Sequence, residues 1–180
     1  MFKDLPLGRV KKRGWIEIGA TRMCLLDVAN GYYALMKEVQ KLAADLRPLI
    51  FYNGGKQGGA SFARGALESD LFRRDRNGFE MCVEAYSLCG FGDFDIRDID
   101  YQAGKATITC PDAFEAWAVL QHDETSPEPV CHYTRGVLCS FMSVLKRKAF
   151  ECEEIHCRAK GDKECEFIIH PAKKRLGHDL

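Results

Sequence analysis

The sequence predicts a mixed α/β (α+β) fold, because helical runs and short strand pairs are interspersed along one chain of 180 residues. In 32–46 and 130–145 the apolar residues recur at the spacing of a helix face. In 94–110 and 149–170 two short apolar stretches flank a tight turn, as in a β-hairpin. A chain of this length is sufficient for one compact domain with a small appended lobe.

The N-terminal part is expected to contain strands and then a helix. Residues 14–27 are rich in β-branched and aromatic positions and predict one or two short strands, after which Asp27 or Asn30 can cap a helix. The helix over 32–46 has an apolar face formed by Leu35, Met36, Val39, Leu42 and Ala43.

Five glycines make the segment 48–67 ambiguous between a loop and a helix that packs very closely on a neighbour. Its string NGGKQGG resembles a phosphate-binding loop but lacks the GxxxxGK[ST] order of that motif. We therefore expect close helix packing or a turn here, and no nucleotide site.

The middle of the chain follows the same two periodicities. A helix is predicted over 78–89, and the hairpin over 94–110 turns at Ala103-Gly104. The stretch 114–120 fits a strand or a helix. Residues 123–129, DETSPEP, are expected to be an exposed connection and the boundary of a lobe, because they contain two prolines and three acids.

Charge and hydropathy exclude two classes of partner. The 26 basic and 26 acidic side chains cancel, so no overall field draws the chain onto nucleic acid or an anionic membrane. The N-terminus lacks the apolar region of an export signal, and no apolar run reaches the roughly 20 residues that cross a bilayer. We expect a cytoplasmic protein without a direct nucleic-acid or membrane partner.

Nine cysteines in a chain expected in the cytosol indicate metal binding or core packing rather than disulfides. Zinc takes thiolate, imidazole or carboxylate donors from at least two chain segments, and the turn between 149–157 and 164–170, where Gly161 can take a positive φ, presents such donors together. The candidate donors near this turn are Cys131, Cys152, Glu153, Glu154, His156, Cys157, Cys165 and His170.

The residues alone leave the metal site open. On a regular strand Glu154 and Cys157 point to opposite faces, so both can bind one ion only if the strand is bent or bulged. The alternative is that the cysteines are small buried core residues. We accept this alternative for Cys24, Cys82, Cys89, Cys110 and Cys139.

The order of the C-terminal residues resembles the 4-vinyl reductase domain family. The resemblance rests on EPVC at 128–131, a helix, E-x-x-C at 154–157, a Gly-containing turn and C-x-F at 165–167. It is close from about residue 110 to 171, and upstream of that it holds only in outline. The family includes effector-sensing domains of aromatic-responsive activators, archaeal hydrocarbon-binding proteins and a protein of bacteriochlorophyll synthesis.

In the sensor members of the family, three cysteines and one glutamate hold a zinc ion. The resemblance implies the same zinc cofactor here, with the ligands Cys131, Glu154, Cys157 and Cys165. A closed set of four ligands leaves no position for a substrate, so the zinc is expected to be structural. His156 and Cys152 are the neighbouring donors most easily mistaken for ligands.

The family also implies how the chain is organised. Helices pack on an antiparallel sheet and enclose an apolar pocket beside a small C-terminal zinc lobe (about 130–171), usually in a homodimer. Residues 1–27 then hold N-terminal strands and are a candidate dimerisation segment. Residues 28–171 form the ligand-binding domain, which includes the lobe, and 172–180 are a polar tail.

Aromatic residues are the candidates for lining the pocket, although each also suits the core. The candidate ligand-binding residues are Tyr86, Phe114, Trp117, His122, Tyr133 and Phe141. Phenol sensors of the family anchor the hydroxyl with a histidine and a tryptophan. The positions that we align with this pair are Tyr86 and Phe114, so the sequence does not predict phenol itself.

Three functions are compatible with the resemblance. A sensor domain for a small hydrophobic or aromatic molecule is favoured over an enzyme, because no nucleophile and base stand at a recognisable spacing and we name no catalytic residue. The alternative is an enzyme or accessory factor of tetrapyrrole (bacteriochlorophyll) vinyl reduction, but no GxGxxG motif follows a predicted strand. The third is an adaptor, since subunits of vesicle-tethering complexes share the fold.

Overall fold

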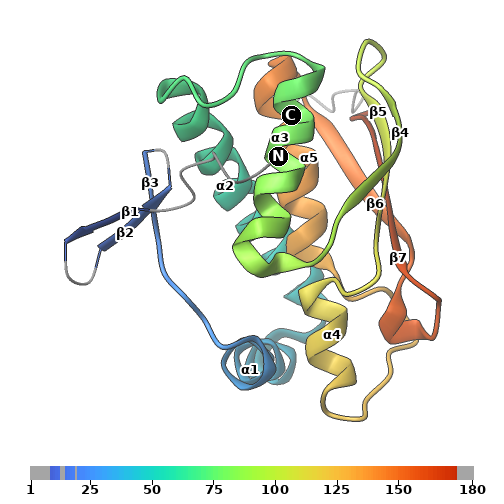
Figure 1. The fold of residues 1–180 in the computed structure, drawn as a ribbon. Helices are drawn as coiled ribbons and strands as arrows, with labels where there is room; N and C mark the ends of the chain where they lie inside the picture. The colour runs from blue at the N-terminus through green and yellow to red at the C-terminus, as the bar shows by residue number, and fades with distance from the viewer. Residues whose placement is uncertain (1–8, 13–14, 19, 174–180) are drawn as a thin grey trace, which may run out of the picture.

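In the computed structural model, which describes residues 9–12, 15–18 and 20–173, two antiparallel sheets are packed with helices (Figure 1). The main sheet has the strand order β4 (Asp95–Asp100), β5 (Lys105–Cys110), β7 (Cys165–Pro171), β6 (Phe150–His156). The small sheet is a meander of β1 (Arg9–Lys12), β2 (Trp15–Ile18) and β3 (Thr21–Met23). The predicted α+β class with antiparallel sheets is confirmed.

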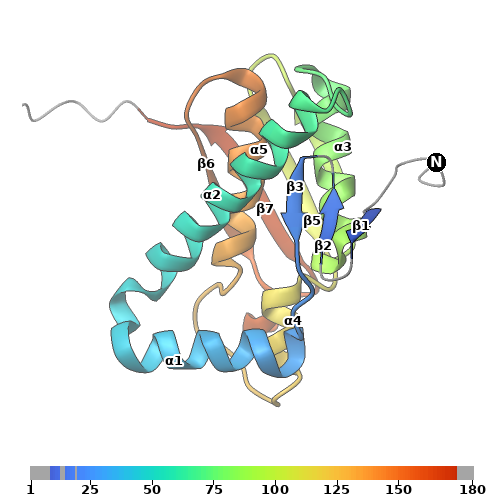
Figure 2. The same cartoon turned by 90° about the vertical axis from the view of Figure 1, so that its left-hand side faces the viewer.

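The helices are arranged around α5 (His132–Lys146), which packs on β6 with one face and on α2 (Arg47–Glu68) with another. The helix α3 (Arg76–Tyr86) lies beside α5 (Figure 1). Figure 2 shows α1 (Tyr33–Ala43) and α4 (Phe114–Leu120) at one end of the molecule, away from the far end of α2. The core therefore lies on both sides of α5.

Glycines let α2 and α5 approach each other backbone to backbone. A Cβ on Gly55 would stand 2.0 Å from the carbonyl oxygen of Tyr133, and a Cβ on Gly136 would stand 2.1 Å from that of Tyr52. Neither position has room for a side chain. The ambiguous segment 48–67 is therefore part of a helix, and the expected close helix packing is confirmed.

Other elements lie close to their predicted positions. The helix predicted over 32–46 is α1 followed by a 3₁₀ turn, and Asp27 caps the preceding π turn by accepting the N–H groups of Ala29 (3.0 Å) and Asn30 (3.4 Å). The helix predicted over 78–89 is α3, continued by the π turn Ser87–Phe91. The undecided stretch 114–120 is the helix α4.

The two predicted hairpins join into one sheet. In the first, Ile96 pairs with Ile108 and Ile99 with Ala106. In the second, β6 pairs with β7, and β7 also pairs with β5 along its length. Residues 130–171 therefore contribute two strands to the main sheet, and the division of the chain into domains stays a prediction.

Some expectations fall on parts of the chain that the structure does not describe. Residues 1–8 of the N-terminal segment and 174–180 of the polar tail lie outside the described residues. Among the helices of the described ranges, none has both the length and the apolar character that a membrane span requires.

Candidate functional site

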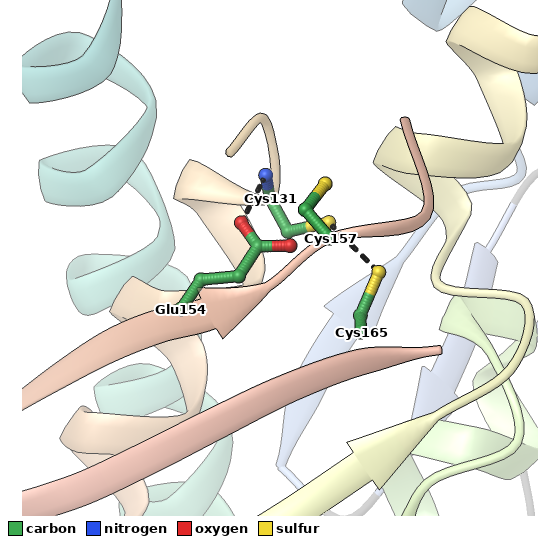
Figure 3. Close-up of side chains that lie close together, drawn as sticks. All are labelled: Cys131, Glu154, Cys157 and Cys165. Atoms are coloured by element: carbon green, nitrogen blue, oxygen red, sulfur yellow. Dashed lines mark hydrogen bonds between the residues drawn. The ribbon is translucent and has the colours of Figure 1, made fainter. Parts of the chain in front are cut away.

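The four expected metal ligands converge at one end of the main sheet, and we call them the metal quartet (Figure 3). Cys131 directly precedes α5, Glu154 lies near the end of β6, Cys157 follows β6, and Cys165 opens β7. All four are buried, and their donor atoms lie within 4.8 Å of one another. Within 9–12, 15–18 and 20–173 no second group of this kind is present.

A bulge in β6 brings Glu154 and Cys157 to the same side. Glu154 still pairs in register with Phe167, but the next pair, His156 with Glu166, is shifted. This irregularity is the bend that a common ligand set requires. The turn that follows is closed by Asp162, whose side chain accepts the N–H of Cys157 at 2.7 Å, and Gly161 has the expected positive φ, 101°.

The distances in the metal quartet suit a tetrahedral ion. The sulfur atoms of Cys131 and Cys165 are 3.8 Å apart, too far for a disulfide. Two thiolates on a tetrahedral zinc, each about 2.3 Å from the ion, stand roughly 3.8 Å apart. Oε2 of Glu154 accepts the backbone N–H of Cys131 at 2.9 Å, whereas its Oε1 is buried without a hydrogen-bond partner. A cation would satisfy this oxygen, so the residues present fit zinc.

The electrostatics of the metal quartet also favour a cation. Hydrogen bonds from the thiols of Cys131 and Cys165 hold the pKa of Cys157 well below its ordinary value. Burial raises the pKa of Glu154 to about 9 and raises that of Cys131 well above its ordinary value. One thiolate therefore forms readily, but further negative charge in this buried set is unfavourable without a positive ion.

A metal held by this set would have a structural role. Four protein donors complete a tetrahedral shell and leave no position open to a substrate. The ion would tie the start of α5 to β6 and β7, which lie far apart in sequence. The neighbouring His156 lies outside the set: its side chain is 54% exposed and approaches Asp162 and Glu166.

Four of the six candidate ligand-binding residues lie in one group of rings. The ring centroids of Tyr86 and Phe141 are 6.1 Å apart, as are those of Phe114 and Tyr133. Phe91 joins the two pairs, since it stacks on Tyr86 at 4.2 Å and meets Phe114 edge-on at 5.2 Å. We call these five residues the aromatic cluster.

The other two candidates lie outside the aromatic cluster. Trp117 and Phe114 both line a surface hollow of about 560 Å³. His122 is exposed, stacks on Tyr33 at 3.6 Å, and its Nε2 lies 2.7 Å from the carbonyl oxygen of Ala29. The partners of His122 thus belong to the start of α1 and the turn before it.

Two residues of this region were missed from the sequence. Phe91 stands between two glycines in the string GFG, and that string was its only signal. Glu115 was a single acid in the otherwise apolar helix FEAWAVL. In the structure Glu115 is 1% exposed, and burial raises its pKa to about 7.

The carboxylate of Glu115 caps α5 from inside the core. It accepts the backbone N–H groups of Tyr133 at 3.0 Å and Thr134 at 2.8 Å, and the hydroxyl of Tyr32 at 3.0 Å. These N–H groups belong to the first turn of the helix, where the helix dipole favours a negative charge. Glu115 thus fixes the stretch of α5 that separates the metal quartet from the aromatic cluster.

Residues 115–171 match the family model of the 4-vinyl reductase domain. The whole metal quartet and Tyr133 and Phe141 fall within the matched region. The resemblance to this family is therefore confirmed over that region of the chain. Among curated proteins, none matches the chain by sequence.

The fold as a whole is similar to that of the phenol-responsive sensory domain of the transcription activator PoxR, solved with phenol. The TM-score is 0.81 at 26% identity, over 92% of this chain and 85% of that chain. A likeness in fold alone extends to a vinyl-4-reductase family protein from Methanocaldococcus jannaschii (TM-score 0.51, 16% identity, 79% of this chain and 77% of that chain). It extends also to a trafficking protein particle complex subunit 3 from Naegleria fowleri, covalently bound to palmitic acid (0.56, 14%, 79% and 91%).

Proposed function

We propose that this chain is a sensor domain that binds a small aromatic or hydrophobic molecule and that is stabilised by a structural zinc ion. The observation that carries this proposal is the likeness, over 92% of the chain, to a sensory domain solved with phenol. The buried rings of the aromatic cluster support it from within the chain, because ligand pockets are lined mainly by apolar and aromatic groups.

The proposed ligand site is formed by the aromatic cluster, with Trp117 beside its entrance. The rings of Tyr86, Phe114 and Tyr133 offer faces and edges for a planar molecule. The hydroxyl of Tyr86 and that of Thr134 lie 3.2 Å apart in the buried interior and provide a polar anchor. The hollow beside Phe114 and Trp117 gives a path from solvent.

The proposed zinc ligands are the metal quartet. The ion would neutralise the negative charge that the quartet holds when its four groups are deprotonated, and it would contribute directly to the free energy of folding. The backbone N–H of Arg158 donates to the sulfur of Cys165 at 3.4 Å, a contact that stabilises a thiolate. The chemistry of the zinc site is in this proposal structural and not catalytic.

We further propose that the domain forms a homodimer through residues 25–50. Seven of the nine exposed large apolar side chains in the described ranges fall in this segment: Leu25, Leu26, Leu35, Leu42, Leu46, Leu49 and Ile50. Leu25 is 90% and Leu42 is 85% exposed. Such a concentration of exposed leucine is typical of a surface that another protein covers. Self-association would also give a sensor a way to signal.

Native mass spectrometry tests these proposals together. The zinc-loaded protein is incubated with phenol, toluene and indole, and its mass is compared with that of the denatured chain. We expect the mass of two chains, one zinc per chain, and an added mass from at least one of the three compounds. A zinc-loaded protein that retains none of them at millimolar concentration would contradict the sensor function while leaving the zinc site intact.

A further inference from the structure

Phe91 stands where the ring of a bound aromatic molecule would stand. Its ring is nearly parallel to that of Tyr86, with centroids 4.2 Å apart and an interplanar angle of 15°, and edge-on to that of Phe114 at 5.2 Å and 83°. The ring of Tyr133 is 6.3 Å away at 13°. These are geometries in which aromatic rings attract one another. The three proposed ligand-binding rings thus already have an aromatic partner, and it is a side chain of the protein.

Glycines flank Phe91 on both sides and differ in their freedom. Gly90 has φ 86° and Gly92 has φ 137°, values that residues with a side chain rarely adopt. A Cβ on Gly90 would meet no atom within 4 Å, whereas a Cβ on Gly92 would lie 2.6 Å from the sulfur of Cys110. The backbone can therefore rotate at Gly90, while Gly92 is held against the core.

The segment around Phe91 is anchored at both of its ends. The side chain of Ser87 accepts the N–H of Phe94 at 3.0 Å, and that of Asp112 accepts the N–H of Asp93 at 2.7 Å. Between these anchors the chain forms the π turn Ser87–Phe91, a rare form that often occurs at functional sites. A movement of Phe91 would be confined to this turn and would leave α3 and β4 in place.

The surface hollow beside the aromatic cluster can receive the displaced ring. It is lined by Leu88, Gly90 and Gly92 on the side of the π turn, and by Phe114 and Trp117 opposite. Phe114 contacts Phe91 and also faces the hollow. Rotation at Gly90 would move the Phe91 ring along Phe114 onto apolar surface, and it would vacate the place between the rings of the cluster.

We propose that Phe91 is an intramolecular stand-in for the ligand, which binds by displacing the Phe91 ring from the aromatic cluster into the hollow. This inference rests on the proposed sensor function and adds to it the size of the ligand and the mode of entry. The ligand should contain one benzene-sized ring, because that is the group it replaces. The apparent affinity is reduced by the fraction of molecules in which Phe91 holds the place.

The variant Phe91→Ala tests the stand-in by vacating the place. Phenol and benzene are titrated by calorimetry into the zinc-loaded full chain of the wild type and the variant. We expect Phe91→Ala to bind at least one of them about tenfold more tightly, because the ligand no longer has to break two close ring contacts. The matched control is Leu88→Ala, which shortens a 41% exposed side chain of the same turn and should leave the affinity unchanged.

The outcomes separate this inference from the proposed function. If the wild type binds and Phe91→Ala binds equally or more weakly, the stand-in is overturned while the sensor function stands, because Phe91 is then part of the pocket wall. If only Phe91→Ala binds, the stand-in is supported. If neither protein binds, both are overturned, since an emptied apolar site of this size should accept benzene.

Two further readouts cover a variant that folds poorly. Phe91→Leu retains most of the apolar volume but cannot stack on Tyr86, so it should bind with an affinity between those of the wild type and Phe91→Ala. In the wild-type protein, nuclear Overhauser effects between the rings of Phe91 and Tyr86 should disappear on saturation with phenol. Persistence of these signals at saturation would overturn the displacement.

Discussion

The metal quartet and the aromatic cluster both meet the first turn of α5, but different forces hold them together. In the quartet, four polar donors lie within 4.8 Å of one another, and one buried oxygen, Oε1 of Glu154, has no partner. In the aromatic cluster, Tyr86 and Phe91 stack at 4.2 Å with no polar group between them. The quartet is therefore incomplete without an ion, whereas the cluster is already filled by a ring of the chain.

This difference shows how each kind of site reveals its ligand. Hydrogen bonds and metal bonds are directional, so a missing partner leaves an orphaned atom that identifies the site. Apolar contacts are not directional, and a flexible segment can fill an apolar site with its own side chain. A polar site is thus recognised by what it lacks, and an apolar site by which of its residues is able to leave.

The largest effect should follow from breaking the metal quartet. Cys157→Ser removes the thiol that ionises first, and serine is a poor zinc ligand. We expect loss of the zinc and of at least about 4 kcal/mol of unfolding free energy, because a buried metal site contributes directly to folding. Zinc content and urea unfolding measure the two effects.

The matched control for this prediction is Cys139→Ser. Cys139 is also fully buried, but its thiol donates to the carbonyl of Gly136 at 3.2 Å, a bond that a serine hydroxyl can replace. It should keep its zinc and lose no more than about 2 kcal/mol. A Cys157→Ser protein that retains one zinc per chain would show that the quartet is not the site.

The metal quartet could be predicted from the sequence because its chemistry is specific. Thiols and a carboxylate at the spacing of 154–157 and 165 match a known ligand set, and few other residues offer those donors. The bulge that brings Glu154 and Cys157 together could not be predicted, because the shift occurs in the pairing with β7. The position of β7 between β5 and β6 is likewise a non-local property.

The aromatic cluster could be predicted only as a set of candidates. Rings that line a ligand site and rings that fill a core have the same helical spacing, so the sequence listed both kinds. His122 was included, and the structure gives it partners in Tyr33 and Ala29 instead. Phe91 was omitted, because its place depends on the positive φ of Gly90 and Gly92, which a local pattern does not reveal.

The next effect tests the helix contact that supports Tyr133. Gly55→Ala would place a Cβ 2.0 Å from the Tyr133 carbonyl, so α2 and α5 must move apart. We expect a loss of about 3 kcal/mol in urea unfolding. Because Tyr133 belongs to the aromatic cluster, aromatic binding should weaken as well, while the zinc content stays at one per chain.

Gly54→Ala is the control for this contact. Its Cβ would lie 3.9 Å from the Tyr133 ring, an ordinary contact, and alanine favours the helix by about 1 kcal/mol over glycine. Gly54→Ala should therefore be neutral or stabilising. Equal stability of the two variants would contradict the backbone-to-backbone contact between α2 and α5, and loss of zinc in Gly55→Ala would show that the two sites are not independent.

The smallest effect concerns Glu115, which fixes the stretch of α5 between the two sites. Burial raises its pKa to about 7 from an ordinary value of 4.5. Between these pH values the folded state retains a proton that the unfolded state has released, so the stability from this group falls as the pH rises. From pH 5.5 to 8 the expected loss is about 2 kcal/mol.

Glu115→Gln isolates this contribution, because glutamine does not titrate and its amide oxygen can still accept the N–H of Thr134. Urea unfolding of zinc-saturated wild type and variant is compared at pH 5.5 and pH 8. The other titrating groups are common to both proteins, so the wild type should lose about 2 kcal/mol more than the variant over this interval. The same pH dependence in both proteins would mean that Glu115 is ionised throughout, with the three hydrogen bonds from Tyr32, Tyr133 and Thr134 outweighing the cost of burial. In that case the start of α5 would hold a permanent negative charge close to the metal quartet, and the need of the quartet for a cation would be greater still.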